Sequence, residues 1–244
     1  ATQHGTLSGR GANLTYTPAD DYRGPDSFTF KANDGTADSD PATVSIAVNA
    51  VNDAPVANED TKSTNEDTPL VFAARQLLGN DEPGPANESG QTLTVTAVDQ
   101  AVNGQVSLGT NGDITFTPDA DFNGQASFEY TVCDNGSPSE CSEMIAIVNV
   151  TVSPVNDAPS FTAGADQTVA EDSGPHSIPG WASGISAGPA DESDQQLTFE
   201  VTNNTNTDLF TTQPSVAADG TLSYALAADM IGSADVTVRL KDNG

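Results

Sequence analysis

The sequence predicts an all-β fold made of tandem antiparallel Greek-key β-sandwiches in a linear array. The run Leu14–Asp34 returns as Ile114–Asp134 and, in a more divergent form, as Leu222–Asp242. The pentapeptide VNDAP at Val51–Pro55 recurs 104 residues later at Val155–Pro159. A repeat of about one domain's length indicates an array of like modules, which is typical of proteins built for reach and contact.

The repeat divides the chain into three parts. We expect residues 1–54 to be the later strands of a first module and residues 55–157 to be one complete module. Residues 158–244 are expected to form a third module that lacks its last strand. Because the chain starts in the middle of a repeat, we also expect it to be a fragment of a longer secreted protein.

The complete module reads as short strands separated by Asn-Asp and Asn-Gly turns about every ten residues, a spacing typical of an antiparallel sandwich. One helical turn is indicated, at Ala74–Leu78. Phe128 and Tyr130 lie two residues apart on one strand, so they share a face and should belong to the core. The expected strands are Leu70–Ala73, Thr92–Val98, Gln105–Leu108, Asp113–Thr117, Ser127–Val132 and Ile145–Val152.

The chain is strongly acidic, with seven Lys and Arg against 35 Asp and Glu and a formal net charge of −28. This charge disfavours nucleic acid and anionic membranes as partners and favours metal cations, above all Ca²⁺, which prefers oxygen ligands. The alternative is that the charge serves only solubility or adaptation to salt. No apolar run is long enough to insert this segment into a membrane.

The two cysteines, Cys133 and Cys141, lie on either side of the short loop Asp134–Glu140. The two arms of a hairpin could bring them within disulfide range. A disulfide across this hairpin implies an oxidising, extracytoplasmic setting. Two unrelated, reduced cysteines are the alternative.

Several motifs together resemble the tandem cadherin-like, Ig-like repeats of large bacterial surface and secreted adhesins. They are the VNDAP linkers, the Glu-Asp pairs at Glu66–Asp67 and Glu171–Asp172, the strand-Thr-Pro-Asp-aromatic-Gly run and the closing Asp-Asn-Gly. The resemblance covers essentially the whole chain. It implies an extracellular or cell-surface location and calcium ions held between successive repeats.

The resemblance also implies a ligand set, by position in the repeat. An acid of the first strand, an acid between later strands, the linker residues and acids of the following repeat would share each ion, because no short stretch offers six to eight oxygens. For the second junction these are Glu66, Asp121, Asn156, Asp157, Asp191, Asp194 and Asp242. For the first junction they are Asp21, Asn52, Asp53, Asn87 and Asp134.

Each of these acids also has a simpler interpretation. Asp134 and Asp242 precede Asn-Gly and suit a turn, Asp21 and Asp121 could cap tight turns, and Glu66 could be a solvated charge. The first junction carries Asn87 where the second carries Asp191. We therefore expect the second junction to bind calcium more tightly.

The function favoured by these patterns is a calcium-rigidified structural or adhesive region of a bacterial extracellular protein. An enzyme is not expected, because similar carboxylates recur at equivalent places of the repeat and no nucleophile or phosphate-binding loop accompanies them. The alternative function is direct recognition of a carbohydrate or of another copy of the chain. Trp181, the only tryptophan, would then be the contact residue, unless it fills the core of the third module.

Overall fold

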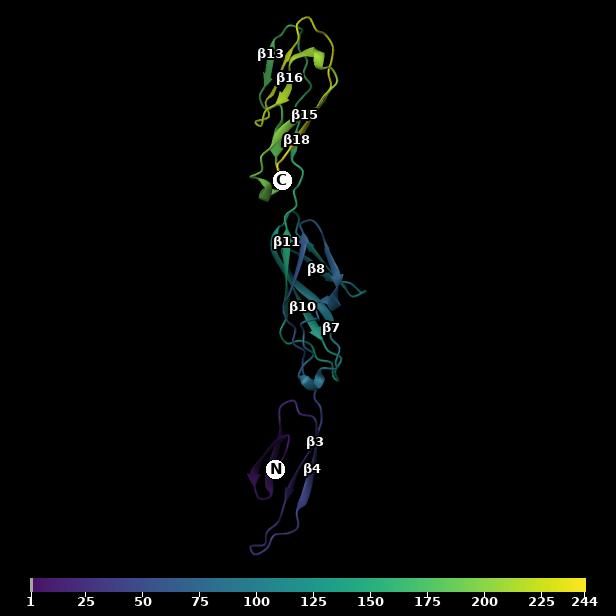
Figure 1. The fold of residues 1–244 in the computed structure, drawn as a ribbon, viewed down its shortest axis with the longest axis vertical. Helices are drawn as coiled ribbons and strands as arrows, with labels where there is room; N and C mark the ends of the chain where they lie inside the picture. Colours follow the sequence, from purple (N-terminus) through teal and green to yellow (C-terminus); the bar gives the residue numbers. More distant parts are fainter. Residues whose placement is uncertain (1) are drawn as a thin grey trace. The chain divides into compact units, whose positions relative to one another are not determined.

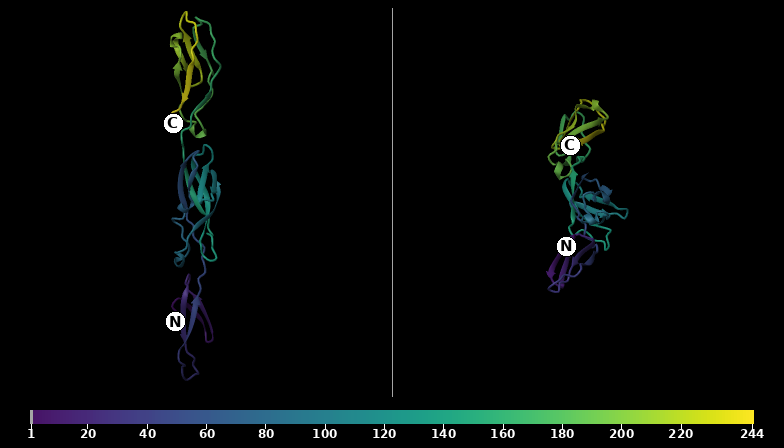
Figure 2. Two further views of the ribbon diagram at one scale, coloured as in Figure 1. Left: turned by 90° about the vertical axis from the view of Figure 1, so that its right-hand side faces the viewer. Right: turned by 60° about the horizontal axis from the view of Figure 1, so that its bottom comes forward.

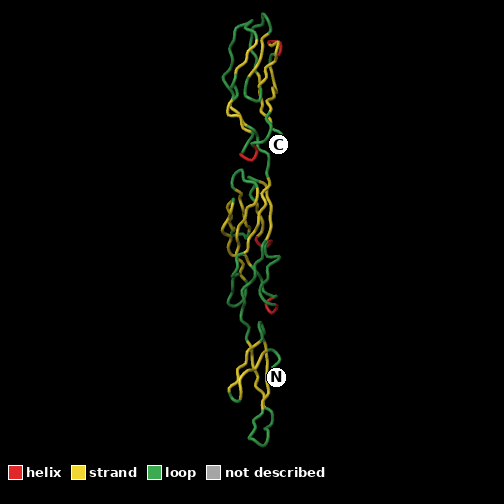
Figure 3. The backbone as a smooth tube through the Cα atoms, turned by 90° about the vertical axis from the view of Figure 1, so that its left-hand side faces the viewer, coloured by secondary structure: helices red, strands yellow, loops and turns green. Residues whose placement is uncertain are grey.

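The computed structural model describes residues 2–244. Strands make up nearly all of its regular structure, and the helical segments are single 3-10 turns (Figure 3). The chain forms two compact units, one ending at Pro154 and the other running from Val155 to Gly244. The prediction of an all-β fold is confirmed, whereas the exact division into three modules stays a prediction.

The first part of the chain consists of two strand pairs with few buried residues. Its strands are β1 (Gly5–Arg10), β2 (Asn13–Pro18), β3 (Gly24–Phe30) and β4 (Ala42–Val48), and β1 pairs with β2 and β3 with β4. Apolar side chains such as Leu14 and Phe30 are 41% and 48% exposed. A buried carboxylate ties the two pairs together: Asp26 accepts hydrogen bonds from the Gln3 and His4 N–H groups and from the Tyr16 hydroxyl.

The middle repeat is a complete sandwich of two sheets (Figures 1 and 2). One sheet has the order β5-β11-β10-β7 and the other the order β6-β9-β8. The strands are β5 (Asp60–Asn65), β6 (Leu70–Ala73), β7 (Thr94–Val102), β8 (Gly104–Leu108), β9 (Asp113–Pro118), β10 (Gly124–Cys133) and β11 (Ala146–Ser153). The 3-10 turn η1 (Ala74–Gln76) lies at the expected helical turn.

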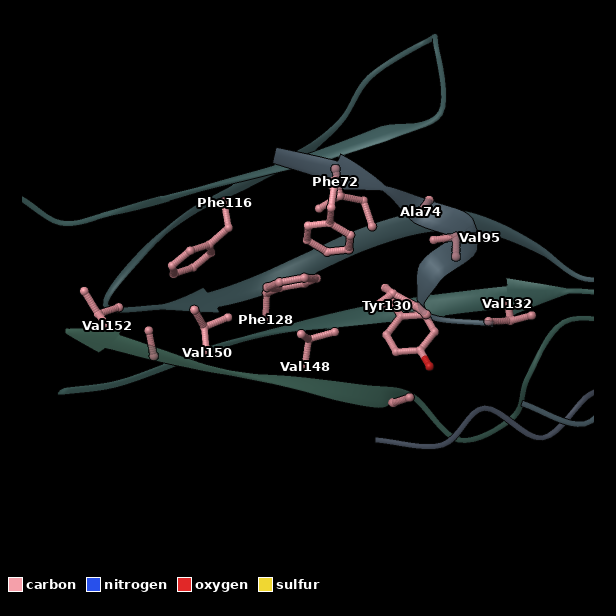
Figure 4. Packing of buried hydrophobic residues seen from close by; sticks show 14 residues of the cluster. Phe72, Ala74, Val95, Phe116, Phe128, Tyr130, Val132, Val148, Val150 and Val152 are labelled. Atoms are coloured by element: carbon pink, nitrogen blue, oxygen red, sulfur yellow. The ribbon is translucent and has the colours of Figure 1, made fainter. Parts of the chain in front are cut away.

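Alternation along β9, β10 and β11 builds the core of this repeat. Successive side chains of a strand point to opposite faces, so every second residue is buried. Phe116, Phe128 and Val148 are fully buried between the sheets, and the two phenylalanine rings lie 5.9 Å apart (Figure 4). Tyr130 is 1% exposed, and its hydroxyl points away from the aliphatic side chains (Figure 4).

One strand was not expected from the sequence. β5 carries polar residues only, Asp60–Asn65, and it pairs in parallel with β11 at the edge of the four-stranded sheet. Main-chain pairing with Val148–Ser153 of β11 holds this strand in place, and no apolar face of its own contributes. A polar edge strand of this kind gives no hydrophobic signal in the sequence.

The second unit repeats the plan with smaller sheets. Its sheets are β13-β17-β16, β15-β18 and β12-β14. The strands are β12 (Ser160–Thr162), β13 (Pro175–Ile178), β14 (Ser183–Ser186), β15 (Thr198–Asn204), β16 (Phe210–Val216), β17 (Leu222–Leu226) and β18 (Val236–Lys241). A buried cluster around Ala182, Val216, Leu222 and Tyr224 forms its core.

Cys133 and Cys141 form a disulfide, as predicted. The bond closes a short loop, since the two residues are eight positions apart in the sequence. The loop begins with Asp134, whose main-chain N–H donates to the Glu140 carbonyl. The disulfide therefore braces the segment that carries one of the candidate ligands.

Reduction of this disulfide should lower the free energy of unfolding of the middle repeat by about 2–3 kcal/mol, the value expected for so short a closed loop. Urea denaturation of the wild type with and without reductant, and of a Cys133→Ala/Cys141→Ala variant, would measure the loss. Reaction of both cysteines with a thiol reagent in the native, unreduced protein would contradict the prediction.

Candidate metal centre

The first linker is fixed to the middle repeat by its polar side chains and main chain. The Asn52 amide donates to Asp134 Oδ2 at 2.9 Å, and the Gln91 amide donates to Asn52 Oδ1 at 2.6 Å. The Asp53 N–H donates to both carboxylate oxygens of Glu88 at 3.2 Å. Linker residues and acids from two loops are thereby gathered at one end of the repeat.

The second unit contains the same arrangement. The Asn156 amide donates to Asp242 Oδ1 at 3.3 Å, and the Gln195 amide donates to Asn156 Oδ1 at 2.8 Å. The Asp157 N–H donates to Glu192 Oε1 at 2.8 Å. The first linker site is defined as Asn52, Asp53, Asn87, Glu88, Gln91 and Asp134. The second linker site is defined as Asn156, Asp157, Glu192, Gln195 and Asp242.

A 3-10 turn places the glutamate of each site. The turns are η2 (Ala86–Glu88) and η3 (Ala190–Glu192), and each follows a proline. The Glu88 N–H donates to the Pro85 carbonyl at 2.8 Å, and the Glu192 N–H donates to the Pro189 carbonyl at 3.2 Å. Glu88 and Glu192 are each only 6% exposed, although an ionised carboxylate is costly to bury without a partner.

Glycines make room for these carboxylates. Gly84 and Gly188 have positive φ angles of 139° and 153°. A Cβ atom at Gly84 would collide with Glu88 Oε2, and one at Gly188 would collide with Glu192 Oε2. Glycine is therefore required at both positions for conformation and for space.

Buried oxygen atoms without a hydrogen-bond partner gather at the two sites. Among the described residues five buried side-chain polar atoms lack a partner, and four of them belong to these loops: Asn87 Oδ1, Gln91 Oε1, Glu192 Oε2 and Gln195 Oε1. The fifth is the Tyr224 hydroxyl, in the core of the second unit. All four are acceptors, so what would satisfy them is a cation or a hydrogen-bond donor.

Hydrogen bonds hold the Asp134 carboxylate of the first linker site in its ionised form. Burial alone would raise the pKa of Asp134, but hydrogen bonds from the Glu140 N–H, the Asn52 amide and the Gly136 N–H outweigh it and lower the pKa. The hydrogen bonds of the first site involve the carboxylates of Glu88 and Asp134, and those of the second site involve the carboxylates of Glu192 and Asp242. A set of carboxylate and amide oxygens is chemistry that suits Ca²⁺.

The other predicted ligands of the middle repeat lie near strand ends. Glu66 is 3% exposed and accepts a hydrogen bond from the Asn123 amide at 3.3 Å. Asp121 has a left-handed conformation with φ 55°, and its N–H donates to Asp67 Oδ1 at 3.1 Å. Asp121 therefore forms a tight turn, as its simpler interpretation proposed, and its role as a ligand stays a prediction.

The same turn occurs in the other two parts of the chain. Asp229 has φ 57°, and its N–H donates to Asp172 Oδ1 at 3.1 Å. Asp21 has φ 58° and is exposed. Aspartate tolerates this left-handed region better than most residues, which explains why the turn recurs with Asp at this position.

Sequence reasoning singled out Asp191 in the η3 turn and Asp194 just after it, whereas the residue that reaches the linker is Glu192 between them. Both aspartates are exposed, and their role as ligands stays a prediction. Glu88, Gln91 and Gln195 were missed in the same way. A signal was present, because Pro85–Gln91 (PANESGQ) returns as Pro189–Gln195 (PADESDQ) with Pro, Ala, Glu, Ser and Gln unchanged.

Trp181 is half-buried and packs against the core of the second unit. Its indole N–H donates to the Ala165 carbonyl at 3.2 Å. These contacts support its interpretation as a core residue of the third module.

Comparisons with known proteins agree with this architecture. Residues 51–152 match the family model of a cadherin-like domain, and residues 1–47 match that of a bacterial Ig domain. Protocadherin Fat 1 of Homo sapiens is 30% identical over 181 residues, which are 67% of this chain and 4% of that protein.

Among solved structures, the protocadherin gamma B2 extracellular cadherin domains 1–5 resemble the whole fold, with a TM-score of 0.53 and 17% identity. The alignment covers 99% of this chain and 47% of that chain. This chain thus spans less than half the length of the relatives that it matches here. No helix among the described residues is long and apolar enough to cross a membrane.

Proposed function

We propose that the chain is a calcium-binding structural region of an adhesive protein. The match of residues 51–152 to the family model of a cadherin-like domain, a family of extracellular adhesion domains, supports this proposal. Calcium binds at the two linker sites. Each ion holds its linker against the repeat that follows and so stiffens the joint. The proposal extends to a bacterial cell-surface or secreted parent protein, in line with the match to a bacterial Ig domain.

The observation that carries this proposal is the repetition of one polar arrangement. In both linkers the Asn amide donates a hydrogen bond to an Asp late in the repeat, and a Gln amide donates to the Asn side chain. The main-chain N–H of the Asp that follows the Asn donates to a buried Glu. The structural core does not require these groups, because they lie at the ends of the repeats and leave acceptor oxygens without partners. A cation is the simplest common partner for such oxygens.

The residues that would hold calcium are the carboxylates and amide oxygens of the two linker sites. Calcium accepts mixed shells of carboxylate, amide and carbonyl oxygens. It would neutralise a part of the −28 charge that otherwise disfavours the compact state. Glu66, Asp121, Asp191 and Asp194 stay predicted ligands.

The expected partners are calcium and neighbouring repeats of the same protein. Recognition of a glycan or of a second copy of the chain stays an untested prediction. Its main sequence support, Trp181, is engaged in the core of the second unit.

Millimolar calcium should raise the melting temperature of the chelator-stripped protein. A ligand present at 100 times its dissociation constant stabilises the folded state by about 2.7 kcal/mol. For a single repeat of roughly 100 residues, this stabilisation corresponds to a rise in the melting temperature of roughly 10–20 °C. Differential scanning calorimetry of the whole chain would show the shift.

Sodium chloride at matched ionic strength is the control, because it screens charge without filling a specific site. An equal rise with sodium would mean that the acids are only a solvated, self-repelling surface. We further expect the second linker site to fill at lower calcium concentration, since Asp191 stands where the first site has Asn87.

A further inference from the structure

Two carboxylates converge on one buried hydroxyl in the middle repeat. The Tyr130 hydroxyl oxygen lies 2.7 Å from the Asn58 carbonyl oxygen, 3.1 Å from Asp60 Oδ2 and 3.1 Å from Asp81 Oδ1. Its ring belongs to the core, and Figure 4 shows the hydroxyl at the margin of the aliphatic side chains. Asp60 opens β5, and Asp81 lies in the loop that follows η1.

The hydrogen atoms available at this point are too few for the acceptors. A phenol has one hydrogen to donate, and the closest acceptor is the Asn58 carbonyl. The Asn58 N–H donates to Asp81 Oδ1 at 2.8 Å. If both carboxylates were ionised, Asp60 Oδ2 would face the phenol oxygen with no hydrogen between them, a repulsive contact at 3.1 Å.

The nearest basic group does not remove this deficit. Lys62 stands two residues after Asp60 on β5, and its charge favours the ionised form of Asp60. Its ammonium group, however, lies 5.0 Å from the centroid of the Phe72 ring. The charged and titratable groups that act on the pair are thus Lys62, Tyr130 and the two carboxyls themselves.

The repeat itself shows that the fold does not need this polar group. Aligned on the repeated VNDAP linker, the positions of Asp60 and Asp81 are taken in the second unit by Gly164 and Ile185. In the alignment of Ile114–Asp134 with Leu222–Asp242, the position of Tyr130 is taken by Val238. There Ile185 and Val238 pack against the apolar core.

We propose that Asp60 and Asp81 share one proton in the folded middle repeat, which makes this repeat more stable at mildly acidic than at neutral pH. The proton supplies the missing hydrogen between a carboxyl group and the phenol oxygen. Its loss leaves two like charges at a partly buried site.

The direction of the pKa shifts supports the geometry. Burial raises the pKa of Asp60, and the neighbouring Asp81 charge adds to the rise, while Tyr130 and Lys62 oppose it. Burial also raises the pKa of Asp81, against hydrogen bonds from the Asn58 N–H and from Tyr130. With folded values above the unfolded value of about 3.9, the added stability is fully present below that pH and is lost as the pH rises through the folded values.

The test compares isosteric variants, because the remaining acids of the chain also make its stability depend on pH. The whole chain is denatured in the presence of a chelator, and the midpoint of the unit that ends at Pro154 is measured between pH 4 and 7.5. The proteins compared are the wild type, Asp60→Asn and Asp81→Asn. Asp99→Asn, which removes an exposed carboxylate of β7, is the control. We expect Asp60→Asn to be more stable than the wild type at pH 7.5 and to lose this advantage toward pH 4, while Asp99→Asn parallels the wild type.

Parallel curves for Asp60→Asn and the wild type would overturn the proposal. Carbon NMR of the aspartate carboxyl groups in the wild type gives an independent reading that requires no variant. At least one of the two resonances should titrate above 3.9, and titration of both at or below this value would refute the shared proton. A Glu88→Gln variant, in which Asp60 and Asp81 are unchanged, gives a further check. The proposal also fails if calcium restores the stability of this variant at pH 7.5, because Asp60 and Asp81 would then be a cation site.

Discussion

The Glu192→Gln variant should lose most of the calcium-dependent stabilisation of the unit that runs from Val155 to Gly244. Glu192 is 6% exposed, and one of its carboxylate oxygens accepts from the Asp157 N–H while the other has no partner. Glutamine keeps the shape and can still accept from Asp157, but it removes the charge that a divalent cation would require. At saturating calcium the loss should approach about 2.7 kcal/mol.

Without calcium the same substitution should have the opposite effect. A buried, unpaired carboxylate destabilises the folded state, so glutamine is expected to raise the stability of the chelated protein. The matched control is Asp208→Asn, which removes one exposed charge from the same unit. If Glu192→Gln and Asp208→Asn respond to calcium like the wild type, the buried glutamate holds no cation.

The Phe128→Ala variant should lower the free energy of unfolding of the middle repeat by about 3–5 kcal/mol, the usual cost of removing a buried phenylalanine. Phe128 is fully buried, and its ring stacks on that of Phe116 between the two sheets. The cavity left by the truncation can collapse only in part, because the two sheets on either side of it are held by hydrogen-bonded strands. Urea denaturation would measure the loss.

Val71→Ala is the control for this variant. Val71 lies on β6 of the same repeat but is 58% exposed, so its truncation should change stability by less than about 0.5 kcal/mol. Similar losses in both variants would mean that Phe128 is not the centre of the core.

The core of the middle repeat could be predicted from the sequence, because strands such as β9 and β11 alternate apolar and polar residues. β5 could not be predicted in this way. Its residues Asp60–Asn65 are all polar, and only pairing with the main chain of β11 makes them a strand.

The linker sites were predicted in part. Asn52, Asp53, Asn156 and Asp157 stood out because the VNDAP linker repeats. In the structure the Asp53 and Asp157 N–H groups donate to a buried glutamate, and the Asn52 and Asn156 amides donate to a late aspartate. The glutamates themselves were missed, since a 3-10 turn decides which of several neighbouring acids points to the linker. The Tyr130 cluster was beyond sequence reasoning, because Asn58, Asp60, Asp81 and Tyr130 meet only in the folded repeat.

Equilibrium dialysis against calcium, with the bound metal counted in the wild type and in a Glu88→Gln/Glu192→Gln variant, decides whether the linker sites hold calcium. We expect saturable binding of at least two calcium ions by the wild type, one for each linker site, and loss of these ions in the variant. Equal calcium binding by the two proteins, or none by the wild type, would contradict this expectation.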